Sequence, residues 1–190
     1  MTHQQIYWHT TLNMPGEEHA ATPLPSKVDV AVIGGGFTGL SAARALAKSG
    51  INVAVLEAET IGWGASSRNG GMTRTGRKPS RQSVIKKYGR DLAKRLFQVS
   101  LDSVDTVEQV IKEESIDCGF KRYGHLYVAS KPHHFDSFYD EVDFMSKEFN
   151  HNVRVVPPNE LQDEIGSTKY HGGIVDEVSG GLNPAQYVAG

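Results

Sequence analysis

The segment VDVAVIGGGFTG, residues 28–39, joins an apolar run to a glycine-rich turn and determines the expected fold class. Its first part, Val28–Ile33, is rich in β-branched residues and predicts a strand buried on both faces of a sheet. Three glycines at positions 34, 36 and 39 follow it with the G-x-G-x-x-G spacing. In this pattern the first glycine permits a tight turn, the second lets the backbone approach a pyrophosphate, and the third lets the next helix pack closely on the sheet. The stretch therefore predicts a phosphate-binding turn between a strand and a helix.

The residues after this turn complete a βαβ unit. A helical pattern covers Thr38–Ser49, Gly50 is placed to end it, and NVAVLE at Asn52–Glu57 predicts a second strand. This order implies two parallel strands joined by a right-handed crossover. Glu57 follows the turn by about 20 residues, where an acidic side chain binds the adenosine ribose hydroxyls and repels a 2′-phosphate. The unit is expected to bind a dinucleotide other than NADP, and the glycine spacing alone leaves NAD and FAD both open.

A second glycine-rich segment, GWGASSRNGG at residues 62–71, directly follows the second strand. Its small residues allow close backbone approach, and its hydroxyls, amide N–H groups and the Arg68 guanidinium are donors for phosphate oxygens. The two motifs in this order resemble the D-amino-acid oxidase-type family of FAD-dependent oxidoreductases, and within it the branch of gamma-glutamylputrescine oxidase and glycine/sarcosine oxidase-like enzymes. Tyr7-Trp8 and GGLNPAQYVAG at residues 180–190 are similar to the same branch, so the resemblance covers nearly the whole chain.

The resemblance implies FAD as the cofactor, together with a set of residues that contact it. The expected FAD contacts are Gly34, Gly36, Phe37, Thr38, Gly39, Glu57, Ala58, Gly64, Ala65, Ser66, Ser67, Arg68, Asn69 and Gly70. The implied reaction is oxidation of a C–N bond in an amine or amino acid, with hydride transfer to flavin N5 and reoxidation by O₂ or another acceptor. No catalytic acid or base is identified. Two alternatives stay open: an NAD-binding dehydrogenase, and a flavin-binding fragment without turnover of its own.

The expected architecture is α/β, with a Rossmann-like FAD-binding βαβ domain and part of an α+β substrate domain. The expected parts are an extended N-terminal arm at 1–26, the FAD-binding domain at 27–118, a partial substrate domain at 119–178 and a return to the FAD-binding domain at 179–190. Within the arm, Tyr7 and Trp8 are expected to pack against the body of the protein. Asn183 followed by Pro184 is a strong helix start. Because the sequence stops soon afterwards, we expect it to be the first part of a longer protein.

Composition and charge argue against several other classes of function. A net charge of −2 gives no electrostatic basis for nucleic-acid binding, and no apolar run reaches the roughly 20 residues that cross a bilayer. Cys118 is the only cysteine, which excludes an internal disulfide, predicts no metal site and fits a cytoplasmic location. The basic residues between positions 74 and 87 are interpreted as a solvated face. Solvated or capping positions are expected for His125, His133, His134, His151 and His171.

Overall fold

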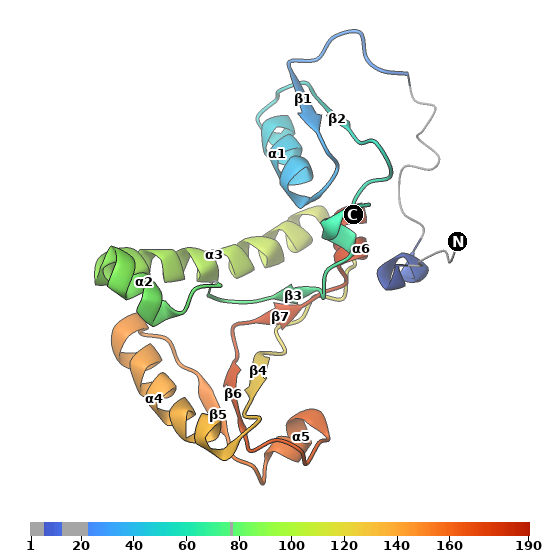
Figure 1. Ribbon diagram of the computed structural model, residues 1–190. Coiled ribbons are helices and arrows are strands. Elements are labelled where there is room, and N and C mark those ends of the chain that lie inside the picture. The colour runs from blue at the N-terminus through green and yellow to red at the C-terminus, as the bar shows by residue number, and fades with distance from the viewer. Residues whose placement is uncertain (1–5, 13–22, 77) are drawn as a thin grey trace. The chain divides into compact units, whose positions relative to one another are not determined.

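The computed structural model describes residues 6–12, 23–76 and 78–190, and its fold is mixed α/β (Figure 1). These residues form two compact units, each assembled from segments that are distant in the sequence. Unit 1 combines Met1–Gly71 with Val110–Phe120 and Leu182–Gly190. Unit 2 combines Met72–Gln109 with Lys121–Gly181. The domain limits expected from the sequence stay a prediction.

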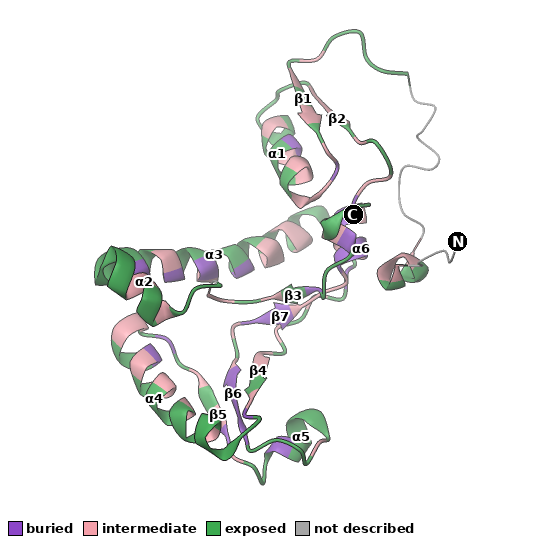
Figure 2. Cartoon of the chain, in the orientation of Figure 1, coloured by how far each residue is buried: buried purple, intermediate pink, exposed green. Residues whose placement is uncertain are grey.

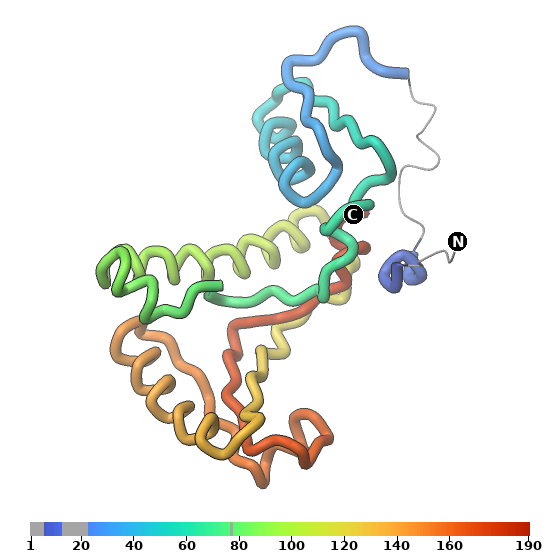
Figure 3. The backbone as a smooth tube through the Cα atoms, in the orientation of Figure 1, coloured from blue at the N-terminus to red at the C-terminus, as the bar shows by residue number. Residues whose placement is uncertain are grey.

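Unit 1 is built on the βαβ unit that the glycine turn predicted. Strands β1 (Val30–Ile33) and β2 (Val53–Leu56) pair in parallel, and α1 (Phe37–Lys48) connects them, as the trace in Figure 3 shows. The remaining elements of unit 1 are η1 (Tyr7–Thr11), η2 (Ala65–Ser67) and α6 (Pro184–Ala189). The Asn183 side chain accepts hydrogen bonds from the first turn of α6, so the helix start expected there is confirmed.

The predicted burial of the first strand on both faces is wrong for the described residues. Positions along β1 alternate between half-buried and exposed, and Ile33 is 79% exposed. The reason is that a strand loses solvent on both faces only when other layers cover both. Among the residues that the structure describes, β1 pairs only with β2, and α1 packs against these two strands. Figure 2 accordingly shows β1 and β2 in the colours of intermediate and exposed residues.

Unit 2 contains a three-stranded antiparallel sheet with helices around it. Its strands are β4 (His125–Val128), β6 (Gly173–Asp176) and β5 (Arg154–Val156), in that order across the sheet. Its helices are α2 (Arg81–Tyr88), α3 (Arg90–Glu114, whose last residues belong to unit 1), α4 (Pro132–Phe149) and α5 (Leu161–Ile165). A separate antiparallel pair joins β3 (Met72–Thr73) to β7 (Gly180–Gly181). The central strand β6 is the most buried of these strands (Figure 2).

The two faces of this sheet differ in chemistry. One face carries an apolar cluster of Val156, Leu161 and Val175, with Leu126 and Val128 packed against it. The register places His125 opposite Asp176 and Tyr127 opposite Ile174, and these four side chains alternate with the apolar set. Because side chains along a strand point to alternate faces, the other face is polar and aromatic. No helix among the described residues is long and apolar enough to cross a membrane.

Candidate functional site

The glycine turn of unit 1 has the steric features expected from its spacing. Gly34 has φ +101°, a left-handed conformation that glycine adopts without strain. A Cβ atom at Gly39 would lie 2.0 Å from the Gly34 carbonyl oxygen and 3.2 Å from the Val32 side chain. Only glycine therefore fits at position 39, because the start of α1 approaches the backbone of the turn so closely. The order strand, turn and helix is confirmed.

The start of α1 presents donors that can bind an anion. The first N–H groups of a helix have no partner within the helix and lie at the positive end of its dipole. The Phe37 N–H donates to Ser66 Oγ at 2.9 Å, whereas the N–H groups of Thr38 and Gly39 have no partner in the described part of the chain. Added Cβ atoms at Gly34 and at Gly64 would meet no atom within 4 Å. Free donors and open space at both glycine segments fit a pyrophosphate group.

The Glu57 side chain contacts the glycine turn directly. Its Oε2 accepts a hydrogen bond from the Gly35 N–H at 2.6 Å, and its Oε1 accepts one from the Glu59 N–H at 3.0 Å. These bonds, that from Gly35 first, lower the pKa of the Glu57 carboxyl below its ordinary value. The carboxylate is therefore ionised at neutral pH and keeps acceptor capacity for hydroxyl groups. Ala58, beside it, is exposed.

The second segment folds as a loop that closes on itself and on the turn. The Gly62 N–H donates to the Gly35 carbonyl at 2.8 Å. Ser67 is fully buried, and its hydroxyl donates to the Gly62 carbonyl at 2.6 Å. The Asn69 side chain donates to the carbonyls of Ala65 and Ser66 and accepts from the Gly71 N–H. These side chains stabilise the loop, so the backbone of Gly64, Ala65 and Gly70 is the exposed part.

Arg68 also makes its contacts within the loop. Its Nε donates to the Trp63 carbonyl at 2.7 Å, and its guanidinium lies over the Trp63 ring at 4.2 Å. A stacked guanidinium keeps its charge and its outer N–H donors. Arg68 is exposed and forms no ion pair with any residue that the structure describes. Its positive charge thus remains beside the loop for an anionic ligand.

Sequence reasoning missed two parts of this site. Gly35 stands at a variable position of the glycine pattern, yet it is buried, and a Cβ there would lie 2.6 Å from Ile61 Cδ1. The second part is η1, which replaces the extended arm expected over the described residues of that region. Trp8 does pack on the body, because its Nε1 donates to the Asn69 carbonyl at 2.8 Å, but Tyr7 is 70% exposed. The aromatic pair was a signal for η1, and no pattern pointed to Gly35.

Unit 2 contains a cavity of about 770 Å³ on the polar face of its sheet. Phe138, Phe144, Met145 and Ile174 supply apolar walls, and Arg74 reaches the cavity from the segment after β3. Arg74 Nη1 donates to His125 Nε2 at 3.1 Å, and its guanidinium lies 5.6 Å from the Tyr127 ring centre. Burial first, and then the Arg74 charge, lower the pKa of His125. The cavity therefore carries a cation beside a neutral imidazole.

Asp176 anchors the polar end of this cavity. Its carboxylate accepts hydrogen bonds from the Thr75 hydroxyl, from His151 Nε2 at 3.1 Å and from the Val178 N–H at 3.2 Å. Burial alone would raise the pKa of Asp176, but the bonds from His151 and Thr75 outweigh it and lower the pKa. The carboxylate already accepts hydrogen bonds from three segments of unit 2. Its role is therefore structural.

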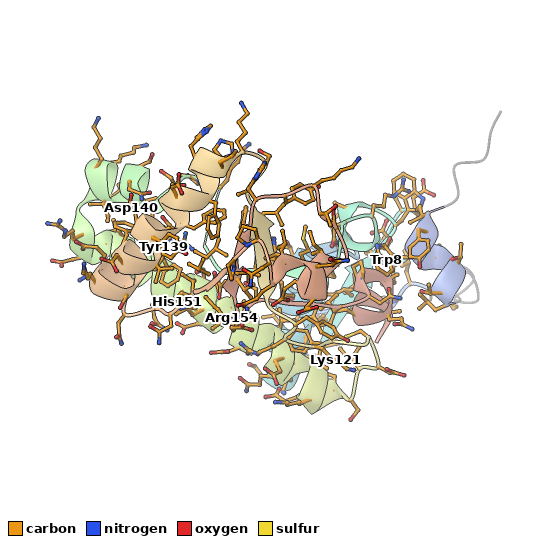
Figure 4. All side chains as sticks on the ribbon, turned by 90° about the horizontal axis from the view of Figure 1, so that it is seen from below. Trp8, Lys121, Tyr139, Asp140, His151 and Arg154 are labelled. Atoms are coloured by element: carbon orange, nitrogen blue, oxygen red, sulfur yellow. The ribbon has the colours of Figure 1, made fainter. Side chains whose placement is uncertain are left out.

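Two interpretations of charged residues are corrected here. The His151 side chain, labelled in Figure 4, is not solvated: it is buried, packs against the Phe97 ring at 5.1 Å and pairs with Asp176. Its backbone N–H donates to the Met145 carbonyl at the end of α4 at 3.2 Å, in line with the capping position expected for it. Arg81 does not belong to a solvated face, because it is half-buried over Phe97 and bonded to Glu141 at 3.1 Å. Both were misread because the sequence does not show which partners the fold brings to them.

Comparisons with known proteins identify the family. The model of the family described as FAD dependent oxidoreductase matches residues 29–190. The chain belongs to the FAD-dependent oxidoreductase family. It is 34% identical over 189 residues to a probable oxidoreductase, OrdL, of Haemophilus influenzae, covering 99% of this chain and 43% of that protein. It is 33% identical over 162 residues to gamma-glutamylputrescine oxidoreductase of Escherichia coli, covering 85% of this chain and 38% of that protein.

A solved structure supports the fold of this FAD-dependent oxidoreductase. Glycine oxidase from Geobacillus kaustophilus is similar with a TM-score of 0.63 and 24% identity, over 85% of this chain and 42% of that one. The chain thus spans about two fifths of the length of these relatives. The family, its FAD cofactor and the branch named from the two glycine segments are confirmed, and the NAD alternative loses its support.

Proposed function

We propose that unit 1 binds the pyrophosphate and ribose of FAD, and that the whole protein oxidises a C–N bond of an amine or amino acid. The observation that carries the cofactor site is the contact between the two glycine segments. Ser66 of the second segment caps the Phe37 N–H at the start of α1, next to two donors that have no described partner. A ligand that meets these donors therefore meets both segments at once.

The proposed role of each residue follows from the hydrogen-bond donors, acceptors or charge that its contacts within unit 1 leave free. The N–H groups of Thr38 and Gly39 would hold phosphate oxygens, and the Ser66 hydroxyl would donate its own hydrogen, since its oxygen already accepts from Phe37. Glu57 would accept hydroxyls of the ribose. The exposed backbone of Gly64, Ala65 and Gly70 would run beside the cofactor, with Arg68 adding positive charge. Ser67 and Asn69 would maintain the shape of the loop.

A charged substitution at Gly36 tests the proposed cofactor site. A Cβ there would lie 2.9 Å from Ser66 Oγ, so every substitution moves that hydroxyl. Gly36→Glu and Gly36→Gln share this steric change and differ in charge. Flavin absorbance retained after gel filtration of the full-length protein should be lost in Gly36→Glu and partly kept in Gly36→Gln, because a carboxylate repels the pyrophosphate. Equal retention of flavin by Gly36→Glu and the wild type would refute the site.

The proposed reaction requires bound FAD to accept a hydride from the substrate carbon. The substrate is proposed to be a small amine or amino acid, and the Escherichia coli relative is named for gamma-glutamylputrescine. In unit 2, Arg74 is a cation without an ion pair to any described residue, and it lies in a cavity with apolar walls. We propose that this cavity binds the substrate, with Arg74 bound to a carboxylate. We further propose O₂ or another acceptor for the electrons, and a cytoplasmic location.

The substrate assignment predicts a separable kinetic effect. Arg74→Gln should raise KM about tenfold or more for substrates that bear a carboxylate, because a charge-assisted hydrogen bond is lost. It should leave KM for the matching amide within about twofold, since that ligand lacks the charge. Steady-state kinetics of the full-length enzyme, with the carbonyl product measured, tests both the C–N oxidation and the role of Arg74. An equal rise in KM for both substrates would contradict the role of Arg74.

A further inference from the structure

The segment η1 lies on the second glycine loop, residues 62–71, and contacts it at two places. The Trp8 indole N–H donates to the Asn69 carbonyl at 2.8 Å, and His9 Nε2 lies 2.6 Å from Ser67 Oγ. Figure 4 labels Trp8 on this segment. A third bond, from the Asn183 side chain to the Thr11 hydroxyl at 2.8 Å, ties η1 to the start of α6. Residues that the sequence separates by about sixty positions are thus joined through side chains.

The contact of His9 with Ser67 has a defined direction. The Ser67 hydroxyl donates its only hydrogen to the Gly62 carbonyl at 2.6 Å, so it can only accept from the imidazole. The hydrogen of His9 must therefore be on Nε2. Burial, followed by the charge of Arg68, lowers the pKa of His9, and the ring is neutral at neutral pH. Ser67 is fully buried, so no solvent can replace the imidazole as its donor.

These bonds form a chain that ends at the pyrophosphate-binding turn. His9 donates to Ser67, Ser67 donates to the Gly62 carbonyl, and the Gly62 N–H donates to the Gly35 carbonyl. Trp8 holds the other end of the loop at Asn69, whose side chain bonds the carbonyls of Ala65 and Ser66. Ser66 in turn caps α1. The contacts from η1 thus fix both ends of the loop relative to the turn.

The exposed residues of the loop lie on either side of Ser67, which His9 contacts. Residues 63–65 and 68–70 are exposed, whereas Gly62 and Ser67 are buried. An exposed loop without anchors samples many conformations, and ordering it on binding costs affinity. A loop already held in its bound shape avoids that cost.

We propose that Trp8 and His9 are positioning residues of the cofactor site, which hold the loop 62–71 in its FAD-binding shape before FAD arrives. The inference rests on the proposed FAD site. It assigns a function to η1, which lies outside both glycine motifs and would not itself touch the cofactor. The expected consequence is weaker binding and faster release of FAD when either anchor is removed, because the freed loop must then be ordered when FAD binds.

The test uses the full-length protein, with FAD affinity measured by flavin fluorescence and release followed by stopped flow. His9→Ala and Trp8→Phe should each weaken FAD binding about three- to tenfold, the size of one lost hydrogen bond. His9→Gln, whose amide keeps a donor for Ser67, should restore affinity to within about twofold of the wild type. Thr10→Ala is the matched control, since Thr10 bonds only to the Tyr7 carbonyl within η1. It should change FAD affinity less than about twofold.

The outcomes separate this proposal from the cofactor site itself. Wild-type affinity in His9→Ala and Trp8→Phe, with loss of FAD in Gly36→Glu, would overturn the positioning role and leave the site intact. Failure of His9→Gln to recover affinity would overturn the donor role of His9. Absence of FAD from the wild type, or its retention by Gly36→Glu, would overturn the proposed function. A double-mutant cycle of His9→Ala with Ser67→Ala should show non-additive losses of affinity, whereas additive losses would count against a direct coupling.

Discussion

The two glycine-rich segments of unit 1 are held in place by opposite means. At residues 34–39 the structure depends on the absence of side chains, because a Cβ at Gly39 would lie 2.0 Å from a carbonyl oxygen. At residues 62–71 it depends on side chains that are present, since Ser66, Ser67 and Asn69 all bond to backbone groups. The first segment is thus defined by sterics and the second by hydrogen bonds. Steric changes in the first segment should therefore have larger effects than lost polar contacts in the second.

The largest effect is expected at Gly39. Gly39→Val would push the start of α1 away from the Gly34 carbonyl, and we expect the free energy of unfolding to fall by about 3 kcal/mol or more. FAD retention should also be lost. Ala47→Val is the control, because Ala47 is exposed on the same helix and should lose only about 0.5 kcal/mol. Chemical denaturation measures the free energy of unfolding of both variants. Equal losses in the two would contradict the steric role of Gly39.

A smaller effect is expected at Ser66. Ser66→Ala removes the cap on the Phe37 N–H, and we expect a loss of about 1 kcal/mol in the free energy of unfolding. FAD binding should weaken about three- to tenfold, because one donor to the phosphates disappears with the cap. Ser41→Ala, at an exposed position of α1, is the matched control. A loss at Ser66 as large as that of Gly39→Val would show that polar contacts are as decisive as sterics.

The smallest effect is expected at Glu57, whose carboxylate accepts a hydrogen bond from Gly35 of the first segment. Its folded-state pKa is lowered, chiefly by the hydrogen bond from Gly35, so its contribution is present above the ordinary glutamate pKa of about 4.3. That contribution is lost as the pH falls through the lowered folded-state pKa. The melting temperatures of the wild type and Glu57→Gln should differ by a constant amount from about pH 6 to 8 and converge below about pH 4. Parallel melting curves down to pH 3 would contradict this contribution of Glu57.

The sequence was sufficient to predict the secondary structure wherever local rules determine it. The βαβ order and the capped start of α6 both follow from spacing and from residue conformational preference. The prediction that β1 is buried on both faces was wrong because the burial of a strand depends on which layers of the fold cover it. His151 and Arg81 were misread for a related reason, since their partners Asp176 and Glu141 are distant in sequence.

The cofactor set was predictable in position but not in the detail of each contact. Glycine spacing placed the free N–H groups of α1, because helix geometry alone orients them. It gave no sign that Ser67 would be buried or that the Asn69 side chain would bond back to the loop, since a run of small polar residues has no periodicity that separates inward from outward positions. The role of His9 could not be predicted from the sequence either, because its partner Ser67 is 58 residues away.

The backbone bond between Gly62 and Gly35 has a consequence for how this region tolerates evolutionary drift. Both of its groups belong to the main chain, so no substitution except proline at position 62 can delete the donor or the acceptor. What a substitution can do is add a Cβ, and at Gly35 the space is already taken by Ile61. Polar contacts in the neighbouring loop can be lost one at a time and regained by related side chains. The backbone contact is instead insensitive to most side-chain changes, and it responds to an added Cβ at Gly35, which requires the Ile61 side chain to move.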